Sequence, residues 1–262
     1  MSGATANGGT HPAPLAGVLE QLRGGLVVSC QAPVQDPFSG PYIMSRMAES
    51  VVRAGAVGVR AQGLDDLAAI RRQISEPLIG LWKDPTGELI ITPTLRHALA
   101  VAATGADIVA LDGTLRQRPD DLSLAEVVEA VHQTAGCLVM ADVSTFDEGI
   151  AAQVAGADVV ATTLSGYTGY SPFSDTPDLA LVEDLASRLA VPVFAEGRIW
   201  SPADARRALD SGAWAIVVGT AITSPAAITA RFCNALPRRG TPERGDQPPG
   251  RLPPLDVPGS QS

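Results

Sequence analysis

Lys83 is one of 19 Lys and Arg residues and the only lysine of the chain. It follows the short apolar run of residues 78–82 and precedes Asp84-Pro85, a turn signal. Arginine is effectively always protonated, whereas a partly buried lysine can lose its proton near neutral pH. The pattern therefore indicates proton transfer or imine formation at Lys83. The alternative is a surface lysine whose stem covers apolar residues.

Polar residues, Lys83 among them, are expected where predicted strands end. Six of them can ionise or bind a polar ligand: Gln31, Arg60, Lys83, Asp112, Asp142 and Glu196. The same ends carry Ser29, Cys30, Thr162, Thr163 and Gly219. Apolar strands have no folding reason to end in this way, so we predict a site where these ends converge. For Asp112, and less so for Asp142, hydrogen bonding to neighbouring loop amides is the alternative.

The pKa of Lys83 depends on which neighbours it has. A nearby carboxylate would raise this pKa, whereas desolvation and a nearby Arg60 would lower it. The sequence leaves that balance open.

Glycines follow the last two predicted strands. Gly197 comes directly after Glu196, and Gly219 ends the eighth strand before Thr220. Barrels often hold a phosphate between these two loops, so we predict phosphate binding by their backbone amides. The alternative is two ordinary turns without a ligand. The loop 166–172 is expected either to cover the site as a lid or to be a simple surface turn.

Strands and helices alternate along the chain. The predicted strands are Leu26–Cys30, Val57–Arg60, Leu78–Lys83, Asp107–Asp112, Leu138–Asp142, Asp158–Thr163, Val191–Glu196 and Trp214–Gly219. The predicted helices are Tyr42–Ala54, Asp65–Gln73, Thr94–Ala103, Ser123–Thr134, Thr145–Ala155 (with Ser144 or Thr145 as its cap), Pro177–Leu189, Ser201–Ser211 and Pro225–Leu236. Eight such units predict an α/β fold, a (β/α)8 TIM barrel. Four helix ends carry Gly-Ala, at Gly55, Gly105, Gly156 and Gly212, and these glycines are expected to be C-caps without chemistry.

A single domain is predicted over residues 15–236. Residues 1–14 are a predicted disordered leader, and residues 237–262 are a predicted disordered Pro-rich tail. His11 lies in the leader, and His97 and His132 are expected on helices away from the site, so none is a catalytic candidate.

Charge and composition narrow the partners. The net charge of −9 and the pI of about 4.8 argue against nucleic acid and anionic membranes. The cysteines Cys30, Cys137 and Cys233 suggest no disulfide framework, which favours the cytoplasm. No signal peptide and no membrane span are expected. No metal-ligand spacing and no dinucleotide fingerprint occur, so neither a metal nor a cofactor is predicted.

Seven motifs in fixed order carry a family resemblance. They are Val27–Ala32, Val57–Ala61, Ile91–Thr94, Met140–Thr145, Ser165–Thr168, Ala195–Ile199 and Val218–Thr223. With them the chain resembles the N-acylglucosamine-6-phosphate (N-acetylmannosamine-6-phosphate) 2-epimerase family, from about Leu26 to Leu236.

The resemblance implies a cytoplasmic, metal-independent isomerase without a cofactor. It would interconvert N-acetylmannosamine 6-phosphate and N-acetylglucosamine 6-phosphate in sialic acid or amino-sugar catabolism. Lys83 would remove and return the proton on the carbon that bears the acetamido group, and Glu196 would assist at the sugar oxygens. The other implied site residues are Gln31, Arg60 and Asp142 for the sugar and its enolate, and the backbone around Gly197, Arg198, Gly219 and Thr220 for the phosphate. The expected partners are the phosphorylated amino sugar and a second copy of the chain in a homodimer.

The chain departs from the family pattern at two places. Ser224 stands where the family usually has a phosphate-contacting arginine, and the loop after Lys83 is shorter and lacks a basic residue. Arg116, Arg118 and Arg198 are the candidates to compensate. A one-base and a two-base mechanism both remain open. The rival functions are an aldolase-type enzyme that uses Lys83 as a Schiff-base nucleophile, and a non-catalytic barrel that binds sugar phosphates.

Overall fold

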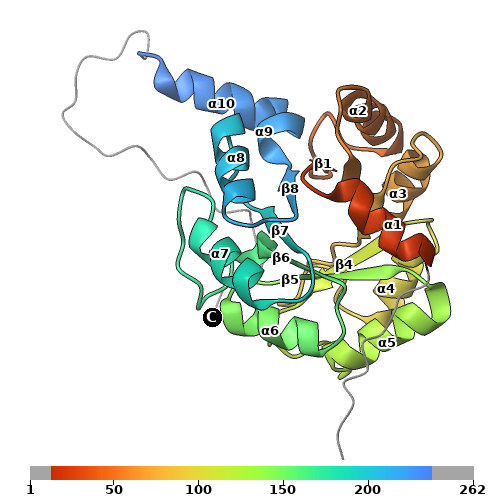
Figure 1. Ribbon diagram of the computed structural model, residues 1–262. Helices are drawn as coiled ribbons and strands as arrows, with labels where there is room; N and C mark the ends of the chain where they lie inside the picture. Colours follow the sequence, from red (N-terminus) through yellow and green to blue (C-terminus); the bar gives the residue numbers. More distant parts are fainter. Residues whose placement is uncertain (1–12, 238–262) are drawn as a thin grey trace, which may run out of the picture.

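Eight parallel strands close into a barrel in chain order, and helices surround them (Figure 1). The computed structural model describes residues 13–237, and the predictions for residues 1–12 and 238–262 lie outside them. The strands are β1 (Leu26–Cys30), β2 (Gly58–Gln62), β3 (Leu78–Leu81), β4 (Ile108–Asp112), β5 (Leu138–Asp142), β6 (Val159–Ala161), β7 (Val193–Glu196) and β8 (Ala215–Val218). The predicted (β/α)8 barrel is therefore confirmed.

The helices follow the strands as predicted, with three additions. They are α1 (Ala13–Leu22), α2 (Pro41–Arg53), α3 (Leu64–Arg71), α4 (Leu95–Ala102), α5 (Leu124–Ala135), α6 (Phe146–Val154), the short 3-10 helix η1 (Thr162–Leu164), α7 (Leu179–Arg188), α8 (Pro202–Asp210), α9 (Thr220–Thr223) and α10 (Pro225–Ala235). Thr94 and Thr145 accept hydrogen bonds from backbone N–H groups at the starts of α4 and α6, which confirms both caps. The helices α1, η1 and α9 were not predicted, and α1 begins before the predicted domain boundary at residue 15.

Alternation along the strands decides which side chains face the barrel interior. On β5, Leu138 and Met140 belong to the interior cluster, whereas Val139 and Ala141 pack against helices. Since side chains of a strand alternate between its two faces, Asp142 continues the inward set. The same count places Arg60 and Glu196 inward on β2 and β7.

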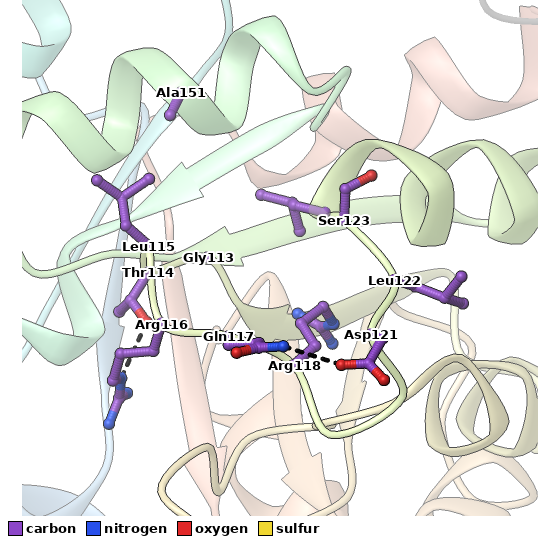
Figure 2. A pocket seen from close by; sticks show the side chains of 11 residues that line it. Gly113, Thr114, Leu115, Arg116, Gln117, Arg118, Asp121, Leu122, Ser123 and Ala151 are labelled. Carbon is purple, nitrogen blue, oxygen red and sulfur yellow. Dashed lines mark hydrogen bonds between the residues drawn. The ribbon is translucent and has the colours of Figure 1, made fainter.

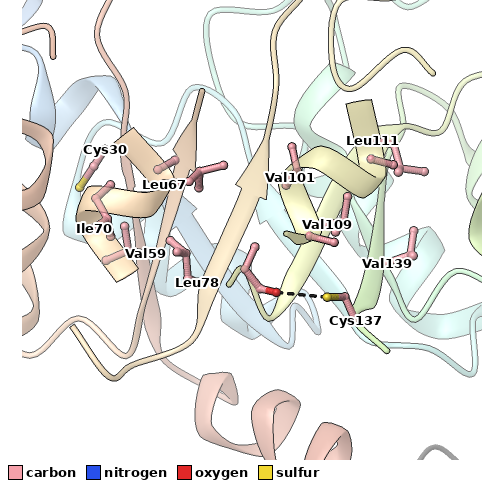
Figure 3. Packing of buried hydrophobic residues seen from close by; sticks show 14 of the residues in the cluster. Cys30, Val59, Leu67, Ile70, Leu78, Val101, Val109, Leu111, Cys137 and Val139 are labelled. Carbon is pink, nitrogen blue, oxygen red and sulfur yellow. Dashed lines mark hydrogen bonds between the residues drawn. The ribbon is translucent and has the colours of Figure 1, made fainter. Parts of the chain in front are cut away.

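The layer between strands and helices is apolar. Figure 3 shows part of it, where Val59, Leu67 and Ile70 pack together with Cys30. Cys30, predicted at the rim of the site, therefore points away from it, and burial raises the pKa of its thiol to about 12. The prediction failed because side chains alternate between the two faces of a strand. Ser29 points into the barrel, so the next residue, Cys30, points outward.

Several strand ends differ from the prediction. β2 continues to Gln62, so Arg60 lies within the strand and not at its end. β6 stops at Ala161 because the hydroxyl of Thr162 bonds the backbone N–H and C=O of Glu196, replacing ladder bonds. β3 stops at Leu81, and the chain then folds back so that Lys83 pairs with Ile91.

Four helix ends repeat one turn. Gly55, Gly105, Gly156 and Gly212 precede β2, β4, β6 and β8, and all have a positive φ, between 89° and 107°. This conformation costs glycine little, as the sequence predicted.

α1 closes the barrel at the end where the strands begin. Leu22 is fully buried in the interior cluster, and Val18 and Leu19 pack against it. The indole N–H of Trp214 donates to the Leu19 carbonyl at 2.9 Å, which ties α1 to the start of β8. No helix within residues 13–237 is long and apolar enough to cross a membrane.

Candidate active site

Arg60 lies at the centre of the polar cluster inside the barrel mouth and is 1% exposed. Its guanidinium holds Asp142 with two bonds, Nη1–Oδ1 at 3.0 Å and Nη2–Oδ2 at 2.6 Å. Nη1 also donates to Glu196 Oε2 at 2.7 Å. The predicted convergence of Arg60, Asp142 and Glu196 is thus what the fold produces.

Thr163 joins the two carboxylates. Its hydroxyl lies 2.6 Å from Asp142 Oδ1 and 3.1 Å from Glu196 Oε2. A hydroxyl has one proton to donate, so it can donate to only one of them at a time. Thr163 was predicted at the rim without a role, and its position in η1 gives it this bridging contact.

The two carboxylates are not equivalent. Asp142 is fully buried, and both of its oxygens are paired with Arg60. The Glu196 side chain is 14% exposed, and its Oε1 makes no hydrogen bond with any described residue. Burial raises the pKa of Glu196, and Asp142 raises it further, although Arg60 and Thr163 oppose the shift. Glu196 is therefore the carboxyl group that can carry a proton towards the mouth.

Lys83 faces this cluster from the β3–α4 segment. The residue is accessible to water, yet the pKa of its ammonium is lowered, first by desolvation and then by Arg60, against the opposing effects of Glu196 and Asp142. Both facts fit an amine inside an open, concave mouth, where water reaches it but protein surrounds it. The balance that the sequence left open thus lowers the pKa of Lys83.

Gln31 follows β1 and has an unusual amide. Its Nε2 donates to Ser29 Oγ at 2.9 Å, whereas its buried Oε1 has no partner among the described residues. A buried unpaired oxygen costs free energy unless a ligand satisfies it. Gln31 is therefore placed to receive a substrate hydroxyl or amide.

The predicted phosphate-binding residues lie in two loops, and Gly197 and Arg198 belong to the loop after β7. Gly197 and Arg198 both have positive φ, 113° and 57°, which is strained for arginine. The Arg198 guanidinium donates to the carbonyls of Ser165 and Thr176 and stacks on Tyr167 at 5.5 Å. Its side chain thus anchors the β6–α7 loop, which leaves its backbone for a ligand.

Gly219 and Thr220 begin the short helix α9. A side chain at Gly219 would lie 3.2 Å from the Ser29 Cβ, a close approach that favours glycine. Thr220 is exposed. The phosphate-binding role of these positions stays a prediction.

None of the arginines proposed to compensate for Ser224 has a free guanidinium. Arg116 donates to Asp112 Oδ2 at 2.7 Å and to a backbone carbonyl, and Arg118 donates to two carbonyls. Ser224 itself caps α10 by accepting from the Ala227 N–H. Asp112 accepts from the Thr114 backbone and hydroxyl as well, which confirms the loop-bonding alternative for it.

The histidines are placed differently from each other. His132 bonds Asp158 near the start of β6, away from the mouth. His97 lies on a helix and outside the mouth, as predicted. It sits in the first turn of α4 and contacts Trp82 and Asp84, the neighbours of Lys83, on the face of their segment opposite the mouth. Nothing in its sequence surroundings signals this, because the contact depends on how residues 84–92 fold back.

A hollow of about 350 Å³ lies outside the mouth, between the β4–α5 loop and α6 (Figure 2). Residues 113–118, 121–124 and Ala151 line it, among them Arg116 and Arg118, and it contains none of the predicted catalytic, sugar-binding or phosphate-binding residues. Of the described residues, no group of three or more His, Cys, Asp or Glu side chains could hold a metal ion.

The chain is similar in sequence and fold to known proteins. A family model described as "Putative N-acetylmannosamine-6-phosphate epimerase" matches residues 44–238. A protein of Cutibacterium acnes named "Putative N-acetylmannosamine-6-phosphate 2-epimerase" is 51% identical over 221 residues, covering 84% of this chain and 96% of that protein. The solved structure of the N-acetylmannosamine-6-phosphate 2-epimerase from Clostridium perfringens has a TM-score of 0.81 and 40% identity, covering 89% of this chain and all of that one. A thiamine phosphate pyrophosphorylase from Pyrococcus furiosus, with 17% identity and a TM-score of 0.56, shares the fold alone.

Proposed function

The chain belongs to the N-acetylmannosamine-6-phosphate epimerase family, and from this premise we propose that it interconverts N-acetylmannosamine 6-phosphate and N-acetylglucosamine 6-phosphate. One observation carries the proposal: Lys83 with a lowered pKa and Glu196 with a raised pKa share one mouth. Both groups are shifted towards their neutral forms. A neutral amine as base and a neutral carboxylic acid as proton donor are what epimerisation beside a carbonyl requires.

The reaction begins at the open-chain form of the sugar, whose aldehyde acidifies the neighbouring C–H bond. Neutral Lys83 takes the proton from the carbon that bears the acetamido group, and the electron pair moves onto the aldehyde oxygen as an enolate. The acid form of Glu196 hydrogen-bonds the developing oxyanion through its free Oε1. Return of a proton to the opposite face of the carbon gives the epimer.

The buried guanidinium has a supporting role in this scheme. Arg60 is 1% exposed and already donates to Asp142 and Glu196. It therefore holds the two carboxylates in place and neutralises their charge, while Gln31 offers its unpaired Oε1 to the substrate.

β3 and β7 lie four positions apart in the ring of eight, so Lys83 and Glu196 face each other across the mouth. This geometry serves both open routes. Lys83 can return the proton alone after the intermediate turns, or Glu196 can deliver it from the other side.

The test is proton exchange in deuterated water. N-acetylmannosamine 6-phosphate is incubated with the protein, and NMR follows the hydrogen on the acetamido-bearing carbon. Deuterium at that carbon of both epimers is expected, and its complete absence would eliminate the function. Retention of some original hydrogen in the first turnover would indicate return by Lys83 alone, since the ammonium carries it back. The unphosphorylated sugar, run in parallel, shows whether exchange depends on the phosphate in a chain that has Ser224 where the family usually has arginine.

A lysine with a lowered pKa is also a good nucleophile, which keeps the aldolase-type alternative testable. Borohydride added during turnover would trap a Schiff base on Lys83, visible by mass spectrometry. We expect no adduct, because epimerisation needs no covalent bond to the sugar.

The sialic acid or amino-sugar pathway and the cytoplasmic location belong to the same proposal. A homodimer is part of it as well. α10 has no buried residues, and its Phe232 is 71% exposed. An apolar helix face of this kind favours contact with a second copy, which sedimentation would measure.

A further inference from the structure

Lys83 is carried by an extended segment that continues beyond β3. The Thr92 N–H donates to the Trp82 carbonyl at 2.8 Å, and the Asp84 N–H donates to the Ile90 carbonyl at 2.9 Å. Side chains of an extended chain point alternately to opposite faces. Trp82 and Asp84 therefore point away from the mouth that Lys83 faces.

His97 contacts both of these outward side chains, Trp82 and Asp84. Its ring packs edge-on against the Trp82 ring, with centroids 4.4 Å apart and planes at 71°. Its Nε2 lies 3.4 Å from Asp84 Oδ2. The imidazole thus contacts the residue before Lys83 and the residue after it.

The ring is itself held firmly. His97 is 3% exposed, and its Nδ1 lies 2.6 Å from the hydroxyl of Thr94, the cap of α4. Arg96 covers the other side: its guanidinium lies 5.3 Å from the Trp82 ring, and its Nη2 lies 3.2 Å from His97 Nε2. α4 therefore presents a fixed ring to the lysine-bearing segment.

The charged groups around His97 are Asp84 on its segment side, Arg96 beside it on α4, and Asp120 from the β4–α5 loop. Burial lowers the pKa of His97 first, and Arg96 lowers it further, whereas the two aspartates raise it. These effects together favour the neutral ring. With its one proton on Nε2, the ring donates to Asp84, and Nδ1 accepts from the Thr94 hydroxyl.

We propose that His97 is a positioning residue for Lys83, because it holds the outward faces of Trp82 and Asp84 and so fixes the direction in which the amine enters the mouth. The assignment rests on the proposed role of Lys83 as the base. A segment freed from His97 could rotate about its own axis, and the amine would leave the surroundings that desolvate it. The pKa of Lys83 would then rise.

The test uses the single lysine of the chain. Acetic anhydride labels amines only in their neutral form, and mass spectrometry of the peptide that contains Lys83 gives the labelling rate at each pH. In the unchanged protein the midpoint should lie below the ordinary lysine pKa of about 10.4. His97→Phe, which keeps the contact with Trp82 and loses that with Asp84, should move the midpoint upwards. It should also lower kcat by about 10- to 100-fold, as small misplacements of a catalytic group do, with KM nearly unchanged.

Two further variants separate positioning from simpler effects. His97→Gln keeps a polar group near Asp84 and should recover part of both changes. Asp84→Asn removes a negative charge, which by charge alone would lower the pKa of Lys83. Loss of positioning predicts a rise instead, so the sign of the shift decides, and this partly exposed site offers a test if His97→Phe fails to fold.

The matched control is His132→Phe. This ring also bonds an aspartate from a helix, but at the other end of the barrel. It should lower the melting temperature without moving the Lys83 midpoint. The proposal is overturned if His97→Phe leaves the labelling midpoint unchanged, or moves it no more than His132→Phe does. Labelling needs no turnover, so this result stands even if the exchange assay shows no epimerase activity.

Discussion

The two sides of the barrel mouth are built in opposite ways. On one side, Arg60, Asp142 and Glu196 come directly from strands, and Arg60 and Asp142 are almost fully buried within a network of ion pairs. On the other side, Lys83 lies past the end of β3 on a folded-back segment. It forms no ion pair with any residue that the structure describes.

The difference separates the paired charges of Arg60, Asp142 and Glu196, which are held in place, from the charge of Lys83, which can be lost with its proton. Burying an ion pair costs desolvation free energy, which close geometry must offset, so such pairs are poor stabilisers but good positioning devices. An unpaired amine has no such partner to hold its proton. The acidic side can thus keep its geometry while the lysine changes its protonation state.

Asp142→Asn should cause the largest change, since it breaks the fixed side. It leaves the buried Arg60 with one carboxylate and should destabilise the fold by about 3–5 kcal/mol, with loss of activity. Urea denaturation measures the change. Asp210→Asn is the control, because its pair with Arg206 is exposed and should cost less than about 1 kcal/mol. Equal effects in the two variants would refute the contrast between buried and exposed pairs.

Lys83→Arg tests the movable side. The deuterium exchange rate should fall by about 10²- to 10⁴-fold, because arginine cannot serve as a base. Stability should hardly change, since Lys83 is exposed and forms no ion pair within residues 13–237. Lys83→Met should even be slightly more stable at neutral pH. A lysine whose folded pKa is lowered costs stability at neutral pH, and that cost is removed only as pH rises from the lowered pKa to about 10.4. A large loss of stability in Lys83→Arg would mean that the two sides are not separate.

The pH dependence should show both sides at once. Exchange should rise with pH as Lys83 deprotonates, below its ordinary pKa, and fall as Glu196 deprotonates, above its ordinary pKa. Because Lys83 and Glu196 interact, the midpoints of the two limbs are properties of the pair and not of either residue alone. Glu196→Gln should remove the basic limb and retain the acidic one. A basic limb that survives this change would belong to another group.

Thr163→Val should have the smallest effect. It removes one hydroxyl that bridges Asp142 and Glu196, at a cost of about 0.5–1.5 kcal/mol. Since that hydrogen bond lowers the pKa of Glu196, its loss should shift the basic limb of the profile to higher pH. Thr163→Ser keeps the hydroxyl and should behave like the unchanged protein. An identical profile in the valine variant would show that the bridge does not tune Glu196.

The sequence predicted those features whose pattern lies within a short segment of the chain. Apolar runs, caps and Gly-Ala turns are local, and the barrel follows from them. Alternation within β5 turned Asp142 inward, so the convergence was predictable from strand ends. The partner of Arg60 was not, because its bond with Asp142 joins residues far apart in sequence.

Two other features also depend on the folded chain. The resemblance implied that the backbone around Arg198 binds the phosphate, which stays a prediction, and only the folded loop shows that its side chain holds two carbonyls. α1 lies in a stretch without a strand pattern, and its role depends on packing under the barrel.

Because of this packing of α1, the barrel is closed at one end and open at the other. With Leu22 and its neighbours as the floor, hydrogen can pass between Lys83 and the bulk liquid only through the open top. A sugar bound there would close this opening. The protons held by Lys83 and by the Glu196 carboxyl group would then be those available for return to the carbon until the product departs, so the isotope content of each released molecule would report how often the opening was exposed to water.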